Sequence, residues 1–373
     1  MKQKLSILLI TSTLICALCA GCNNNSSQTK VTQINEPDSI SAEELKDDTK
    51  DKFTNDNQNN EQQNTSSTST SESESFVFRP IVDSPFYENA YSKEHMQTFR
   101  NMMNALMEYK TEFVIEEGVE WWEVEEFTPY MFPAYEYVVK QIDQNGLTGN
   151  IVYKNDKEST ETLIREFAEK VEWWINSCTK PEEPDVLKAL ELYHKLSLEF
   201  TYDYDVYNSI TQGEFFEEDI SPYHAIMEST GVCQSIAPAY SYLLMQVGID
   251  ACPAGGLLND NSAAHVWTAL KLYDKWFFAD ITYENTDGSE GKRLYYFGET
   301  TEKRANEDNY SIDTMNIGEC NCVWAKDFDF SDERFFVLDN ISEVKEMTYD
   351  SDNVIIEGLD YSCDPITVKI PLE

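Results

Sequence analysis

Three residues in the second half of the chain have the types and the order that a thiol enzyme needs. Cys233 would supply the nucleophile, and His265 and then Asp280 follow it along the chain. Thiol catalysis requires a thiolate, a base that keeps it ionised, and a third group that fixes the orientation of the base. The order therefore predicts catalysis by Cys233, with His265 as its base and Asp280 as the orienting group. His224, just upstream, is a competing candidate for the base.

The segment around Cys233 is predicted to be a helix that favours a thiolate. It begins at Cys233 and runs to Val247, and Gly248 is a typical residue for the end of a helix. Backbone N–H groups and the helix dipole at such a start stabilise an anion and lower the pKa of a thiol. Pro238 cannot donate a backbone hydrogen bond, so we expect a short or kinked first turn.

Three strand-like runs follow this helix, at about residues 250–257, 264–273 and 275–283. The last two are separated by Asp274-Lys275, which predicts an antiparallel hairpin. A helix followed by antiparallel strands indicates an α+β fold rather than a doubly wound sheet.

The register of the hairpin decides which carboxylate reaches His265. A turn at Asp274-Lys275 pairs Asp280 with Ala269 and places Glu284 opposite His265. Asp280 and His265 then share a sheet face but lie about 13 Å apart, at roughly 3.3 Å per residue. Direct contact requires an earlier turn or a bulge, so Glu284 remains an alternative orienting group.

The flanking regions are less specific. Residues 76–183 are predicted to be mainly helical, with apolar positions at helical spacing over about 92–110, 131–143 and 160–177. Pro184 opens a further helix, and Ser221-Pro222 begins a short one that ends at Gly231. Residues 311–373 are expected to be a β-rich extension, which either completes the sheet or forms a small separate one.

Two stretches resemble the transglutaminase-like superfamily: GVCQSIAPAYSYLLMQVGID, and then AAHVWTALKLYDKWFFADITY. That family has Gly-x-Cys at a helix start, a His-x-Trp strand, and a Trp-aromatic-x-x-Asp strand followed by Thr. Cys233, His265 and Asp280 fall on its Cys-His-Asp triad by motif position. Trp267 and Trp276 fall on its two tryptophans.

The resemblance covers about residues 185–300 and implies a papain-like α+β fold, with a catalytic core over 184–310. It also implies acyl transfer through a thioester, by transamidation, deamidation or peptide hydrolysis, without a cofactor. Such chemistry needs an oxyanion donor, for which the Cys233 N–H is one candidate. Residues expected to contact the substrate or the oxyanion are Tyr202, Tyr223, Gln234 and Trp267.

The first residues predict export. Lys2 and Lys4 precede an almost wholly apolar run that closes with Ala20-Gly21-Cys22. This layout resembles a bacterial lipobox and implies a signal peptide over 1–21, lipidation of Cys22, and anchoring at the outer face of the membrane. Residues 22–75 are polar and predict a disordered tether.

Bulk composition bears on the partners. The formal net charge of −40 disfavours nucleic acid and anionic lipid headgroups as partners. We expect a protein or peptide substrate in the cell envelope and no metal, although Cys320-Asn321-Cys322 is half of a possible metal site. Two other functions remain open: a catalytically silent binding or scaffolding module on the same fold, and carbohydrate binding by the pairs Trp121-Trp122 and Trp173-Trp174.

Overall fold

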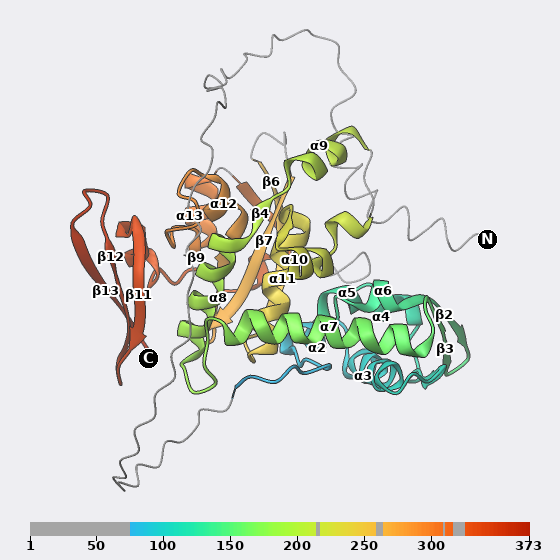
Figure 1. Ribbon diagram of the computed structural model, residues 1–373. Coiled ribbons are helices and arrows are strands. Elements are labelled where there is room, and N and C mark those ends of the chain that lie inside the picture. The colour runs from blue at the N-terminus through green and yellow to red at the C-terminus, as the bar shows by residue number, and fades with distance from the viewer. Residues whose placement is uncertain (1–74, 214–216, 259–263, 309, 316–324) are drawn as a thin grey trace, which may run out of the picture. The chain divides into compact units, whose positions relative to one another are not determined.

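The computed structural model describes residues 75–213, 217–258, 264–308, 310–315 and 325–373 (Figure 1). The expected signal peptide, the lipidation site at Cys22, the tether up to residue 74, and the cysteines of Cys320-Asn321-Cys322 lie outside these ranges. Within them, no helix has both the length and the apolar character needed to cross a membrane.

The N-terminal part contains more strand than the sequence predicts. Its helices are α2 (Pro85–Ala90), α3 (Lys93–Met107), α4 (Trp121–Glu125), α5 (Thr128–Met131), α6 (Tyr135–Val138) and α7 (Lys157–Asn176). A three-stranded antiparallel sheet in the order β1-β3-β2 lies among them, built from β1 (Glu112–Val114), β2 (Val139–Asn145) and β3 (Thr148–Tyr153).

The single helix predicted over 131–143 is therefore wrong. The chain makes two short helical turns there and then enters β2. Gly146 has a φ of 62° in the turn between β2 and β3, a conformation that glycine adopts without a steric penalty. The apolar residues Val139 and Ile142 are buried as part of a strand and not of a helix. Pairing with β3 supplies the backbone hydrogen bonds that a helix would otherwise supply.

The next elements lead to Cys233. They are α8 (Asp185–Glu199), β4 (Thr201–Tyr202), α9 (Tyr204–Gln212), η1 (Glu217–Ile220), α10 (Pro222–Glu228), β5 (Thr230–Gly231) and α11 (Cys233–Gln246). The helix that starts at Pro222 ends at Glu228 and not at Gly231, and its C-cap Ser229 is left-handed with a φ of 58°. Gly231 belongs instead to β5, which pairs in parallel with β4.

A five-stranded antiparallel sheet in the order β10-β6-β7-β8-β9 forms the centre of the fold. Its strands are β6 (Ala251–Leu258), β7 (Ala264–Leu272), β8 (Lys275–Ala279), β9 (Phe297–Glu299) and β10 (Tyr310–Met315). The helix α11, yellow in Figure 1, packs against β6 and β7, and α12 (Ile281–Thr286) packs against α8 and α11. This mixture of helices and antiparallel sheet confirms the α+β class.

The β7–β8 hairpin has a different register from the predicted one. Leu272 pairs with Lys275, so the turn consists of Tyr273 and Asp274, with φ values of 53° and 58°. Two consecutive left-handed residues define a turn whose twist matches that of the strands it joins. The strand β8 ends at Ala279, where the sequence predicts continuation to about residue 283.

The C-terminal strands form a sheet of their own rather than completing the central one. The strands β11 (Glu343–Tyr349), β12 (Asn353–Leu359) and β13 (Pro365–Pro371), red in Figure 1, pair as an antiparallel meander. The short helices η2 (Ala325–Asp327) and η3 (Phe336–Asn340) precede it, and α13 (Thr301–Glu307) lies before β10. The expected boundary at residue 310 falls at the start of β10, which is part of the central sheet.

Two glycines after α12 offer a matched test of how closely this region packs on α8. Gly288 and Gly291 have φ values of 90° and 70°, but a Cβ at 288 would meet nothing within 4 Å, whereas one at 291 would overlap the carbonyl group of Ser197. We expect Gly288→Ala to lower the free energy of unfolding by about 1 kcal/mol. Gly291→Ala should cost about 1–3 kcal/mol more, because the overlap is with backbone. Urea unfolding of both variants checks this, and equal losses would contradict it.

Candidate active site

Cys233 occupies the first turn of α11, where the chain leaves β5. The helix start is fixed locally, because Ser235 Oγ accepts from the Val232 N–H and donates to the Val232 carbonyl, both at 3.0 Å. Gly231 is required beside it, since a Cβ there would overlap the hydroxyl of Ser235. The helix continues through Pro238 to residue 246 without a break.

His265 lies on β7 and contacts both other members of the predicted triad. Its Nε2 is 2.7 Å from Oδ2 of Asp280. Interaction with Cys233 also raises the pKa of this imidazole, and because Nε2 is bound to Asp280, Nδ1 is the nitrogen available to the sulfur. The three predicted residues are thus brought together. Cys233 and His265 are each 6% exposed and Asp280 is 1% exposed, so the cluster lies just below the surface.

Asp280 reaches His265 because it has left the sheet. It is the N-cap of α12, and its Oδ1 accepts from the backbone N–H of Tyr283 at 3.0 Å. Capping is a strong preference of Asp, and it turns the carboxylate away from the direction that a continuing strand would give it. The wide separation expected from strand geometry therefore does not arise.

Two further residues hold this carboxylate and imidazole. Arg304 donates from one terminal nitrogen to Oδ2 of Asp280 at 2.6 Å, and it is completely buried. The ring of Tyr283 stacks on the imidazole of His265, with centroids 4.7 Å apart and planes inclined by 15°. Neither residue is predicted from the sequence, because neither belongs to a motif that marks it.

The charges in this cluster shift the pKa values of its members in opposite directions. Burial acts to lower the pKa of His265, but the charges of Asp280 and Cys233 and the hydrogen bonds to both raise it to about 9. Burial acts to raise the pKa of Asp280, but His265 and Arg304 lower it below its ordinary value. At neutral pH the pair is therefore an imidazolium and a carboxylate.

Glu284, the alternative orienting group, points elsewhere. Its carboxylate accepts from the Tyr193 hydroxyl and the Tyr296 N–H, both at 3.1 Å, and lies 3.4 Å from Arg293. The register that would place it opposite His265 does not occur. Its role in the described structure is to join α12 to α8 and to the segment before β9.

Of the four predicted substrate or oxyanion residues, Gln234 contacts the sulfur and Tyr202 lies on the strand that pairs with β5. The sulfur of Cys233 lies 3.1 Å from Oε1 of Gln234. Tyr202 is placed across from Gly231 by the β4–β5 pair. Its pKa is raised, first by burial and next by the negative charge of Cys233. A Tyr hydroxyl that keeps its proton at any ordinary pH is suited to donate to an oxyanion.

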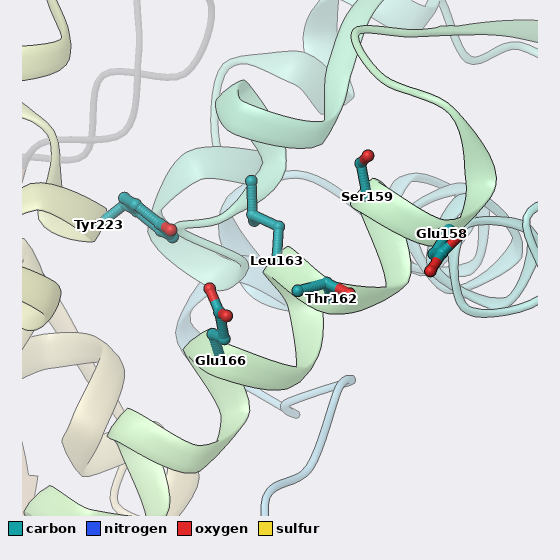
Figure 2. Close-up of a pocket in the computed structure, with 6 residues that line it drawn as sticks. All are labelled: Glu158, Ser159, Thr162, Leu163, Glu166 and Tyr223. Carbon is teal, nitrogen blue, oxygen red and sulfur yellow. The ribbon is translucent and has the colours of Figure 1, made fainter.

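The other two have different surroundings. Tyr223, on α10, stacks on Tyr137 at 3.9 Å and on Phe167 at 5.5 Å. It lines a hollow of about 410 Å³ on α7, shown in Figure 2, whose remaining walls are Glu158, Ser159, Thr162, Leu163 and Glu166. Trp267 is completely buried, so it cannot contact a substrate. The prediction of a substrate or oxyanion contact is wrong for Trp267, whereas Tyr223 packs against rings of α6 and α7.

The tryptophan pairs do not form a common stacking platform. Each pair buries one ring, since Trp121 is 4% exposed and Trp174 is 0% exposed. The exposed ring of Trp173 is covered by the ammonium groups of Lys170 and Lys195, at 4.6 and 5.4 Å from its centroid. Among the described residues, no cluster of three or more His, Cys, Asp or Glu side chains could hold a metal ion.

Comparison with known proteins bears on this geometry. Residues 172–281 match the family model of the transglutaminase-like superfamily. A solved structure titled "Crystal structure of a TGase" is 14% identical over 38% of this chain, with a TM-score of 0.29, and the match spans 43% of that chain. A search of curated proteins found no match. The stretch that is similar to this family includes Cys233, His265 and Asp280.

Proposed function

We propose that this protein is a thiol acyltransferase or hydrolase, with Cys233 as nucleophile, His265 as base and Asp280 as the group that orients the base. One observation carries the proposal: the imidazole of His265 lies 2.7 Å from the Asp280 carboxylate, and Cys233 is close enough to raise the pKa of the same ring. This is the arrangement that activates a nucleophile through an oriented base.

The reaction would proceed through a thioester. The Cys233 thiolate attacks the carbonyl carbon of an amide, and the C–N bond breaks as the imidazolium gives its proton to the leaving amine. Water or a second amine then attacks the thioester carbonyl, neutral His265 takes the proton of that nucleophile, and the thiolate leaves. Asp280 stays ionised throughout and fixes the ring so that Nδ1 faces the sulfur.

The negative oxygen that forms during each attack needs donors. We assign the backbone N–H of Cys233, which is among the first N–H groups of α11 and has no partner within the helix, as one donor. The Tyr202 hydroxyl is the second, because β4 pairs with β5 just before Cys233 and the raised pKa of Tyr202 keeps it protonated.

The substrates we propose are protein or peptide amides in the bacterial cell envelope. This part of the proposal is supported by the lipobox-like start of the chain, which predicts a Cys22 anchor and a polar tether. The net charge of −40 favours neutral or basic segments of such substrates over acidic ones.

A catalytically silent binding module on the same fold is the second candidate. The observation in its favour is the low exposure of Cys233 and His265, 6% each, which leaves a small area of the thiol site open to a substrate. Chemical reactivity of the sulfur distinguishes the two, because a binding module has no need of an activated thiolate.

Labelling with a chloroacetamide-bearing glutamine peptide tests the proposal. We expect mass spectrometry to map the label to Cys233 at neutral pH, with no label at this position in Cys233→Ala and slow labelling in His265→Ala. The exposed Cys363 is replaced by Ser to remove background. His224→Ala, on the neighbouring helix α10, is the matched control and should label like the wild type. Equal labelling rates of His265→Ala and the wild type would contradict the mechanism.

A further inference from the structure

Arg304 on α13 is a buried charge with three carboxylate partners. One terminal nitrogen donates to Asp280, and the other donates to Glu299 at 3.0 Å and to Asp308 at 2.9 Å. The guanidinium carbon lies 4.1 Å from the centre of the Trp267 ring. Arg304 is 0% exposed and lies beyond the family match, which ends at residue 281.

We propose that Arg304 is a positioning residue of the thiol site, whose guanidinium holds Asp280 in the orientation in which that carboxylate binds His265. The inference rests on the function proposed above. It extends the site to α13, so the unit that performs the chemistry includes residues beyond the matched domain.

The geometry explains why an arginine is used here. Its planar guanidinium presents two terminal nitrogens in fixed directions. Glu299 and Asp308 hold one of them, and this fixes the direction in which the other points toward Asp280. A lysine at this position has one point charge and cannot hold both sides at once.

Trp267 provides the floor of this arrangement. It follows His265 on β7 with one residue between them, so both side chains project from the same face of the sheet. A guanidinium stacked on an indole is held over the face of the ring by cation–π attraction. Trp267, the tryptophan of the His-x-Trp motif, therefore helps to position Asp280 by supporting Arg304.

Other charged or titratable groups surround the Asp280–His265 pair on every side. Those that act on its members are Cys233 on α11, Tyr193 on α8, Tyr202 on β4, Tyr283 on α12, and Glu299, Arg304 and Asp308 around α13. Burial raises the pKa values of Glu299 and Asp308 in spite of Arg304, whereas that of Asp280 is lowered. The charge of Asp280 is the first of the three carboxylate charges that raise the pKa of Arg304.

Arg304→Lys tests the proposal in the full chain, because it keeps the charge and removes the fork. We expect the pKa of His265 to fall, since Asp280 is free to turn away, and the alkylation rate of Cys233 by iodoacetamide at pH 7 to drop about 10- to 100-fold. The chain has four histidines, so imidazole nitrogen NMR resolves His265 by comparison with His265→Gln. Arg304→Met should show the same changes to a greater degree in its folded fraction.

Arg334→Lys is the matched control. Arg334 is also stacked on an aromatic ring, at 3.9 Å from the Tyr273 centroid, and it is paired with the carboxylate of Asp332. Its aromatic partner, however, belongs to the β7–β8 turn and not to the thiol site. We expect it to leave both measurements unchanged. Folded Arg304→Lys with a wild-type His265 pKa and alkylation rate would overturn the positioning role. Equal alkylation rates of Cys233 in His265→Ala and in the wild type would overturn the proposed function instead.

Discussion

Asp280→Asn is expected to lower amide acyl transfer by about 10⁴-fold, because it reverses the hydrogen bond that sets the imidazole tautomer. The amide group of Asn would donate to Nε2 of His265. The ring proton would then lie on Nδ1, the nitrogen on the side of the sulfur. A neutral ring in this tautomer cannot accept the proton of Cys233. Release of ammonia or amine from a pool of glutamine-containing peptides measures the loss.

Alkylation of the same variant separates the two tasks of the imidazole. Iodoacetamide needs a thiolate but no proton donor, and an ordinary cysteine is a few per cent thiolate at neutral pH. We therefore expect alkylation of Cys233 to slow by only about 10- to 100-fold. Similar losses in both assays would argue against a proton-donating role for His265.

Glu284→Gln is the matched control for this experiment. Glu284 is a fully buried carboxylate in the same region and was the alternative orienting group, but its partners are Tyr193, Tyr296 and Arg293. We expect the variant to lose stability and to keep wild-type acyl transfer per folded molecule. A loss of activity as large as that of Asp280→Asn would favour Glu284 as the orienting group.

Acyl transfer is also expected to fall above pH 9. The pKa of His265 is raised from 6.5 to about 9, so the imidazolium persists until the pH passes that value. Beyond it, amide acyl transfer should drop about tenfold per pH unit, because the leaving amine no longer receives a proton. Iodoacetamide alkylation should not fall over the same range, since it needs no proton donor.

The same shift has a consequence for stability with a definite sign. A base whose pKa is raised on folding contributes stability that is fully present below its unfolded value, here 6.5, and is lost as the pH rises through about 9. His265→Gln should therefore flatten the decrease in the free energy of unfolding between these values.

An amide acyl-transfer profile that falls near pH 6.5 would show that the imidazole has an ordinary pKa, and would contradict the ion-paired site.

The sequence by itself determined the three residues that could do the chemistry, the helix that begins at Cys233 and the α+β class. These follow from residue types, from the motif around them and from local periodicity, all of which act over a few turns of helix or a few strand residues. The family model over 172–281 confirms the resemblance on which the assignment of the fold rested.

Only the tertiary structure decided how these residues meet. The hairpin register depends on two left-handed residues, Tyr273 and Asp274, and shifting the turn by one residue changes every cross-strand pair. Asp280 contacts His265 because it caps α12, and Arg304 reaches Asp280 from a separate helix further along the chain. A buried ion pair between distant segments leaves no periodic trace in the sequence, since its partners are chosen by packing.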